Sequence, residues 1–410
     1  MDDTMTVLPS QTQILIIGAG PAGSAAARIL AEQGKQVVMI DQQQIGRDKI
    51  CGDGLIPDAH KALTRLGLLD AVMTQAQHVD YVRCVGRHAH VDIKGELAVL
   101  PRRILDEMLV RHAIAGGTQF FGGIRFERAL EDNNGRVIGA VLRQGEHQIE
   151  IKADWVLLAT GAVPKALQTA NMCERHTPNG VALRAYVHAP TMVGRITEME
   201  FVCSVHCRHG YGWIFPEPDG VFNIGVCIID SYTLHEGKGK RKTDANLRQI
   251  FDAFIAEYPQ AKALLQEGEL ISDIKGAPMR CTLQGARWSR AGLMVIGEAA
   301  GATYSCTGEG IGKAMETALL AADAIINART DEDEAEIRTR YEAGLLALKP
   351  KYELYEKANR IHAYPWLADI VIWFANRNEK LRTRMSGILR ETSNPGNPFS
   401  IKGVRRILFG

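Results

Sequence analysis

The sequence has no apolar run long enough for a membrane-spanning helix, which needs roughly 18 or more apolar residues. Its best candidate, WLADIVIWF at 366–374, is about half that length. The first residues, MDDTMTVLPSQTQ, also lack the basic and apolar segments of a secretory signal. We therefore expect a cytoplasmic protein.

Neither sign of charge dominates, because the formal net charge is only +1. This balance gives no overall field that would favour nucleic acid as a partner. The 8 cysteines are scattered and form no disulfide framework, which indicates reduced thiols. One cluster, Cys203, His206, Cys207 and His209, has metal-ligand residue types. It runs along an expected strand, where neighbouring side chains face opposite sides, so we expect no metal site.

The first motif is a dinucleotide loop. Gly18, Gly20 and Gly23 complete GxGxxG between an apolar strand and an Ala-rich helix, and a second apolar strand ends on Asp41. Gly18 permits the tight turn, Gly20 lets the backbone approach a pyrophosphate, and Gly23 lets helix and strand pack closely. The helix N-terminus offers free N–H groups to phosphates, and Asp41 is placed to bind a ribose.

A second strand–loop–helix motif favours FAD as the dinucleotide. A strand at 293–296 ends on Gly297 and Glu298, and after a loop Gly308 and Gly310 open a helix. The acid suits ribityl hydroxyls, and the helix N-terminus suits the pyrimidine edge of the flavin, which is negative when reduced. The chain has no second GxGxxG. We therefore expect NAD(P)H or another reductant, such as an electron-donor protein, to bind only transiently.

Aromatic residues make up only 6% of the chain, yet GYGWIFP at 210–216 has three in seven positions. On a strand, Tyr211, Trp213 and Phe215 share one face. They are either core rings or the wall of an apolar substrate site.

Four segments resemble geranylgeranyl reductase-like flavoproteins in order and spacing: DKICGDGL at 48–55, RRILD at 102–106, GYGWIFP, and GEAAG…TGEGI. The resemblance covers about residues 11–330. That family shares the p-hydroxybenzoate hydroxylase-type FAD fold. It includes archaeal lipid-saturating reductases, plant geranylgeranyl reductases and a menaquinone side-chain reductase. The resemblance implies an FAD-dependent reductase that saturates C=C bonds of a prenyl chain on a lipid, quinone or related metabolite.

Several positions depart from related patterns. Glu298 stands where the family usually has Asp. Thr160 and Pro164 replace the Asp and Ser of the hydroxylases' DGxxS motif, which weakens that interpretation. Flavin-dependent halogenases carry Gly-Trp-x-Trp-x-Ile-Pro, and here Tyr211 and Phe215 replace its first Trp and its Ile. A flavin-dependent monooxygenase or halogenase of a biosynthetic pathway remains the alternative.

Motifs and resemblance together assign roles to individual residues. We expect Tyr211, Trp213 and Phe215 to bind substrate, because aromatic faces stabilise the partial positive charge of a double bond being protonated. Cys51, Tyr211 and Trp213 are the expected catalytic residues, with Cys51, Tyr211 or water as the proton donor, although Cys51 as a buried inert thiol stays open. The expected cofactor-binding residues are Gly18, Gly20, Ala22, Gly23, Asp41, Arg47, Lys49, Cys51, Gly52, Arg102, Gly297, Glu298, Gly308, Gly310 and Ile311.

The pattern along the chain predicts an α/β fold: a discontinuous, Rossmann-like FAD domain, an antiparallel-sheet substrate domain and a C-terminal helical appendage. EDNNGRVIGAVL at 131–142 predicts a hairpin. The expected ranges are 11–75, 95–165 and 275–330 for the FAD domain, 76–94 and 166–274 for the substrate domain, and 331–410 for the helical region.

The C-terminal end is basic. Residues 376–410 contain eight Lys or Arg and two Glu, a net charge of +6. Next to PWLADIVIWF this predicts either a peripheral contact with a membrane surface or a solvated face on a packing helix.

Overall fold

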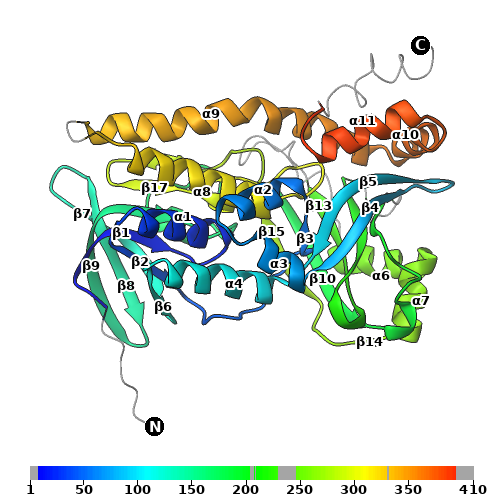
Figure 1. Ribbon diagram of the computed structural model, residues 1–410, viewed down its shortest axis with the longest axis horizontal. Coiled ribbons are helices and arrows are strands. Elements are labelled where there is room, and N and C mark those ends of the chain that lie inside the picture. The colour runs from blue at the N-terminus through cyan, green and yellow to red at the C-terminus, as the bar shows by residue number, and fades with distance from the viewer. Residues whose placement is uncertain (1–7, 204–206, 208, 230–245, 330–331, 394–410) are drawn as a thin grey trace, which may run out of the picture.

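A computed structural model describes residues 8–203, 207, 209–229, 246–329 and 332–393, except for the side chain of Arg360. Within them the strands form two sheets, which lie side by side along the long axis of the molecule (Figure 1).

The first sheet holds the dinucleotide motif. Its central strands are parallel, and β1 carries the continuous apolar run ILII, which is typical of strands buried on both faces. Its strands, in spatial order, are β16 (Ser289–Arg290), β17 (Leu293–Val295), β9 (His147–Leu158), β1 (Gln11–Ile17), β2 (Val37–Asp41) and β6 (Gln119–Gly122), and β7 (Arg125–Glu131) and β8 (Val137–Gln144) pair beside β9. The β7–β8 pair is antiparallel, so the predicted hairpin is confirmed.

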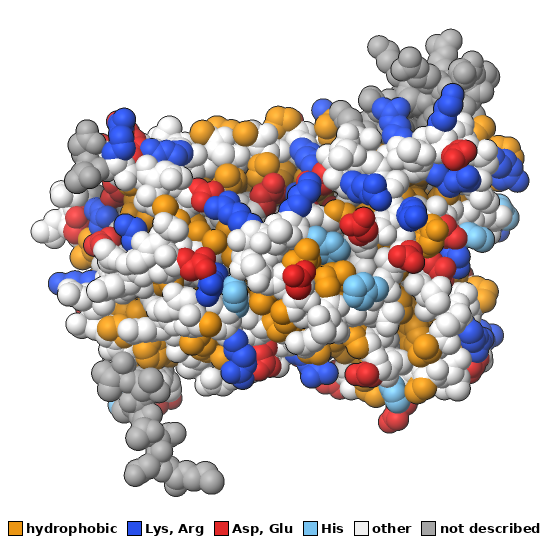
Figure 2. Space-filling view, viewed as in Figure 1, with side chains coloured by type: hydrophobic (Ala, Val, Ile, Leu, Met, Phe, Trp, Pro, Cys, Tyr) orange, Lys and Arg blue, Asp and Glu red, His pale blue; other side chains and the backbone are white. Residues whose placement is uncertain are grey.

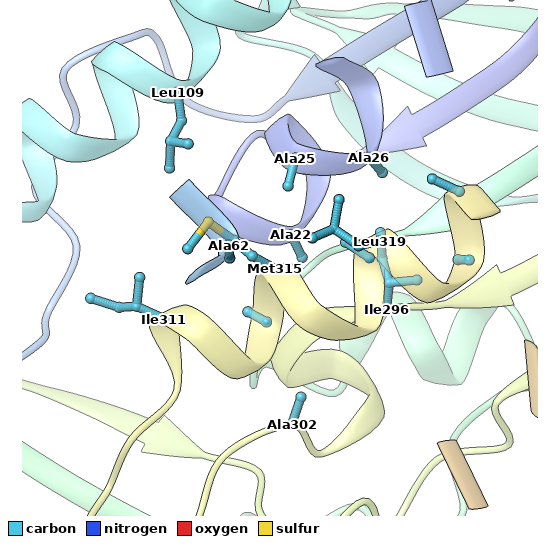
Figure 3. Close-up of a cluster of buried hydrophobic side chains, with 14 of the residues drawn as sticks. Ala22, Ala25, Ala26, Ala62, Leu109, Ile296, Ala302, Ile311, Met315 and Leu319 are labelled. Carbon is cyan, nitrogen blue, oxygen red and sulfur yellow. The ribbon is translucent and has the colours of Figure 1, made fainter. Parts of the chain in front are cut away.

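Helices with small residues cover this sheet. Helix α1 (Pro21–Glu32) packs against α8 (Ile311–Ile326) through buried alanines and Met315 (Figure 3). Their small side chains let the two axes approach closely. Helix α4 (Arg102–Ala115) packs on the other side of α1, and the long helix α9 (Glu334–Ala358) lies along α8 (Figure 1).

The second sheet is antiparallel except where β11 and β4 pair in parallel. Its strands, in spatial order, are β14 (Glu269–Leu270), β10 (Gly180–His188), β13 (Val221–Ile229), β12 (Gly210–Pro216), β11 (Met199–Val202), β4 (Gln77–Val85), β5 (His90–Val99) and β3 (Gly54–Leu55), and β15 (Lys275–Met279) pairs with β10. Strand β5 pairs with β4 along its length, so the expected boundary at residue 95 falls inside one strand of this sheet. Helices α6 (Leu247–Glu257) and α7 (Pro259–Glu267) pack with the apolar residues of one sheet face.

The C-terminal helices α10 (Pro365–Arg377) and α11 (Glu379–Leu389) pack on β5 (Figure 1). The remaining helices are short: α2 (Pro57–Arg65), α3 (Leu69–Gln75) and α5 (Lys165–Thr169). Among the described residues no helix has the length and apolarity to cross a bilayer. Figure 2 shows side chains of both charge signs interspersed over one face of the molecule, in keeping with the balanced composition. The predicted α/β fold, with an antiparallel sheet and a helical C-terminal region, is confirmed.

Candidate active site

One cavity of about 1390 Å³ is lined by residues of both sheets and of the C-terminal helices. It brings together all the residues predicted for the site except Gly23 and Gly297, which do not line it. The cavity has a polar end at the GxGxxG loop, an aromatic wall on β12 and an apolar arm beneath α10 and α11.

The three glycines of the loop have different surroundings. At Gly18, where φ is +105°, an added Cβ would lie 2.5 Å from Ala159 O, and at Gly23 it would lie 1.8 Å from Gly18 O. At Gly20 it would meet only guanidinium tips, Arg47 Nη2 at 3.7 Å and Arg102 Nη2 at 3.9 Å. Gly18 and Gly23 therefore hold the turn and the helix in place, while Gly20 faces the cavity.

Charged side chains surround this polar end. Arg102 makes a bidentate pair with Asp106 at 2.7 and 2.8 Å, and Arg47 Nη2 lies 3.6 Å from the same carboxylate. Asp41 ends β2 and accepts a hydrogen bond from the backbone N–H of Ala19 at 2.9 Å. The side chain of Lys49 also borders the cavity. Two arginines and two aspartates therefore meet beside the start of α1, and a lysine lines the same cavity.

The start of α8 borders the same cavity. Glu298, Gly308, Gly310 and Ile311 all line it. Gly297 adopts φ of +67°, and its added Cβ would lie 2.6 Å from the Cβ of Ala22 on α1. The Cβ of Ala314 on α8 would lie 3.6 Å from the same added Cβ, so Gly297 sits between the first turns of the two helices and lets them approach.

These residues fit FAD. Neither α1 nor α8 has a side-chain N-cap, so their first N–H groups remain available to a ligand. Thr160 also lines the cavity, and the backbone at Gly20 is open to a diphosphate, because an added Cβ there would meet only the guanidinium tips of Arg47 and Arg102.

The aromatic wall has the orientation predicted from strand alternation. Tyr211, Trp213 and Phe215 line the cavity, whereas Ile214 belongs to the core on the other face of β12. The Tyr211 hydroxyl donates to Thr307 O at 2.6 Å, and Trp213 Nε1 donates to Asn223 Oδ1 at 2.9 Å. Both rings are therefore fixed by a hydrogen bond as well as by packing.

The loop that contains Cys51 lies directly on this wall. An added Cβ at Gly52 would lie 3.0 Å from Phe215 Cε2 and 3.5 Å from Trp213 Nε1. Burial, followed by the charge of Asp53, raises the pKa of the Cys51 thiol. Burial also raises the pKa of the Tyr211 hydroxyl. Both groups therefore carry their protons at neutral pH.

Sequence reasoning missed the polar residues behind the loop. Asn223 donates to Cys51 O at 2.9 Å and to Asp53 Oδ2 at 2.8 Å, and the Tyr186 hydroxyl donates to the same oxygen at 2.5 Å. Arg184 pairs with Asp48 at 2.6 Å, and Glu217 is buried next to Asp53. The available signal was a polar residue inside an apolar strand, such as Asn223 in VFNIGVCII.

The apolar arm includes residues of the C-terminal helices. Ile372 on α10 and Met385 and Leu389 on α11 line it together with Val82 and Ile93 of the second sheet. These helices are thus part of the cavity wall.

An ion cluster fixes the end of α11 over the cavity. Glu391 accepts bonds from the buried Lys313 of α8 at 2.7 Å and from Lys351 of α9 at 2.8 Å. Lys313 also lies 3.6 Å from Asp58. Opening the cavity at α11 would therefore separate a buried charge from its partner.

The cysteine–histidine cluster lies only partly in the described chain, because His206 falls outside it. Among the described residues no group of three or more His, Cys, Asp or Glu side chains is arranged to hold a metal ion.

Comparison with known proteins identifies the family. The FAD binding domain family matches residues 11–348. Menaquinone reductase of Mycolicibacterium smegmatis is 31% identical over 340 residues, which cover 77% of this chain and 76% of the relative. Digeranylgeranylglycerophospholipid reductase 1 of Methanopyrus kandleri is 26% identical, over 80% of this chain and 84% of the relative.

Solved structures share the fold. A geranylgeranyl bacteriochlorophyll reductase-like protein from Thermoplasma acidophilum superposes with a TM-score of 0.75 at 20% identity, covering 97% of this chain and 96% of that one. A flavin-dependent brominase superposes with a TM-score of 0.73 at 19% identity, covering 97% of both chains. With the sequence relatives above, the chain belongs to the geranylgeranyl reductase-like family of FAD-dependent oxidoreductases.

Proposed function

We propose that this FAD-dependent oxidoreductase saturates C=C bonds of a prenyl chain carried by a quinone or a lipid. The observation that carries the proposal is the continuity of the cavity. Its polar end fits a dinucleotide, its middle is an aromatic wall, and its arm is lined by aliphatic side chains and methionine. The relatives named menaquinone reductase and digeranylgeranylglycerophospholipid reductase support the same substrate class.

Each part of the cavity has a role in this reaction. FAD, when bound and reduced by NAD(P)H or a donor protein, would supply a hydride to one carbon of the double bond. Gly20, Arg47, Lys49 and Arg102 would hold the diphosphate, and the N-terminus of α8 would stabilise negative charge on the flavin.

The wall and the arm act on the substrate. The ring faces of Tyr211 and Trp213 would stabilise the partial positive charge that develops on the carbon that accepts the hydride, as the other carbon of the double bond takes up the proton. The apolar arm would hold the rest of the prenyl chain and exclude water. Cys51 and Tyr211, both protonated and both at the wall, are the candidate proton donors.

A halogenase or monooxygenase is the rival function, since flavin-dependent brominase shares the fold. The products differ: saturation adds two hydrogens, whereas the rival adds oxygen or halogen. The rings at the Tyr211 and Phe215 positions favour the reductase.

We also propose that α10 meets a membrane surface. Tyr364, Trp366 and Trp373 are 55%, 61% and 43% exposed, and Arg377 lies over the Trp373 ring at 4.1 Å. Amphipathic aromatic rings beside basic side chains are typical of interfacial helices. The opposite face of α10 lines the cavity through Val371 and Ile372, so a chain leaving the bilayer here would have a short route inward.

Replacing Gly20 with valine should abolish FAD binding without unfolding the chain. The new side chain would enter the cavity between Arg47 and Arg102, where the pyrophosphate is expected, but it meets no backbone. Flavin absorbance per chain and circular dichroism measure both effects. Gly23→Ala is the contrasting variant, because its Cβ overlaps Gly18 O and should destabilise the fold itself. A fully flavinated Gly20→Val protein would refute this placement.

Replacing the rings of the wall should slow saturation but spare the cofactor. Tyr211→Leu and Trp213→Leu should each lower product formation by about 2- to 30-fold, since a cation–π contact contributes about 0.5–2 kcal/mol. Mass spectrometry of a menaquinone substrate, by its gain of two hydrogens, measures the effect. Phe254→Leu is the matched control, because Phe254 packs against the opposite face of β12 at Gly212. Equal losses in all three variants would mean that the rings serve only as core.

Binding to anionic vesicles at low salt should depend on α10. Trp366→Ser with Trp373→Ser should reduce co-sedimentation, while FAD content stays constant. Higher salt should weaken binding too, because each basic residue near an anionic surface contributes about 1 kcal/mol that salt screens. Leu346→Ser is the control, since Leu346 is an exposed apolar residue on α9. If the intact protein stays in the supernatant, the membrane proposal fails.

A further inference from the structure

A pair of carboxyl groups lies behind the Cys51 loop, and the reaction as described so far does not use it. Asp53 is fully buried, and its backbone has a φ of +64°. Glu217 follows the wall strand β12 and is 3% exposed. Asp53 lines the cavity, whereas Glu217 interacts with Asp53 and does not line the cavity.

The two carboxyl oxygens of Asp53 have different hydrogen-bond partners. Oδ2 accepts from the Tyr186 hydroxyl and from Asn223, so it is the unprotonated oxygen. Oδ1, like both Glu217 oxygens, has no N–H or O–H partner among the described residues. The Glu217 carboxyl is within hydrogen-bonding reach of Asp53. Two carboxyl groups in contact satisfy each other only when they share a proton.

The surroundings of the pair also favour a shared proton, because they raise the pKa of both carboxyl groups. Burial is the main cause that raises the pKa of both Asp53 and Glu217, and for Glu217 the charge of Asp53 is the next cause. For Asp53 the hydrogen bond from Tyr186 opposes this shift most, followed by the charge of Arg184, the contact with Glu217 and the charge of Arg102. The pKa of Glu217 is raised well above its usual value although Asn223 and Arg184 act against the shift, so Glu217 is the carboxyl of the pair that favours holding the shared proton.

We propose that Asp53 and Glu217 share one proton and serve as the proton reserve of the cavity, resupplying the Cys51 thiol after that thiol has protonated the substrate. The proposal rests on the proposed function. In this step the hydride, with both electrons, would come from reduced flavin as the reductant. The S–H bond of Cys51 breaks, its proton forms the C–H bond at the second alkene carbon, and the thiolate then takes the proton of the pair. Solvent returns a proton to the pair.

A purely structural role would need only the hydrogen bonds of the pair. Glu217→Gln separates the two roles, because a glutamine amide donates to Asp53 Oδ1 as the protonated acid does but releases no proton. Asp53→Asn is the second variant, since its amide oxygen still accepts from Tyr186 and Asn223 while its amide nitrogen donates to Glu217. It carries the test if Glu217→Gln fails to fold.

Glu200 on β11 offers a matched control. It is also a fully buried carboxyl, burial raises its pKa to about 7, and it accepts a bond from the Tyr258 hydroxyl at 2.8 Å. It does not line the cavity. Glu200→Gln therefore removes a buried acid of the same kind from outside the site.

Two measurements on the FAD-loaded protein test the proposal. Infrared spectra are recorded at a pH of about 6, which is below the Glu200 pKa of about 7. The difference between wild type and Glu217→Gln should show the C=O band of a protonated carboxylic acid. Glu200→Gln should lose such a band too. Only Glu217→Gln should slow saturation of menaquinone, by about 100-fold, the lower end for general acid catalysis, with FAD content and melting temperature unchanged.

The proposal also predicts the direction in which turnover changes with pH. Wild-type turnover should fall as pH rises through the folded-state pKa of the pair, because the reserve is then empty, and Glu217→Gln should lack that step. Absence of the Glu217 band, or unchanged turnover of Glu217→Gln, overturns the proposal. If the band is present but wild type saturates no prenyl chain, the proposed function fails while the shared proton stands.

Discussion

The close packing of α1 against α8 is the constraint on which the site depends. Gly297 lies between Ala22 of α1 and Ala314 of α8, and an added Cβ there would be 2.6 Å from the Cβ of Ala22 and 3.6 Å from that of Ala314, so no larger side chain fits between the two helix starts. Both N-termini therefore open into the same cavity without side-chain caps. Each helix end carries a partial positive charge, and the tips of Arg47 and Arg102, which Asp106 holds in place, offer N–H donors beside Gly20. The polar end is thus suited to a ligand with several negative groups before any ligand binds.

Buried polar groups that need partners explain the part of the cavity at the Cys51 loop and the aromatic wall. The loop at Cys51 places a polar backbone between the cofactor end and the aromatic wall. Its buried carbonyl and carboxyl groups need partners, which Asn223 and Tyr186 supply from the second sheet. Asn223 also holds Trp213, so one side chain fixes both the loop and the wall. Cofactor end and substrate wall are in this way parts of one hydrogen-bonded unit.

Local sequence patterns were enough to predict much of this arrangement. GxGxxG and TGEGI predicted the strand–loop–helix units, and strand alternation predicted that Tyr211, Trp213 and Phe215 share a face. The polar cluster could not be found in that way, because Asp53, Tyr186, Glu217 and Asn223 come from separate segments that only the tertiary fold brings together.

The role of the C-terminal helices was missed for the same reason. Residues 331–410 were expected to form an appendage, yet Ile372, Met385 and Leu389 line the cavity. A helix of mixed basic and apolar residues does not reveal from its sequence which surface it covers. Here Glu391 and Lys313, distant in sequence, determine the position of α11.

The central claim is that cofactor and prenyl chain share this cavity, with the double bond at the wall. A crystal structure of the FAD-loaded protein with a bound prenyl quinone measures this most directly. The account predicts density for the chain between the flavin and the rings of Tyr211 and Trp213, continuing into the arm at Ile372 and Met385. A chain bound outside the cavity, or an arm filled by part of the cofactor, would contradict it.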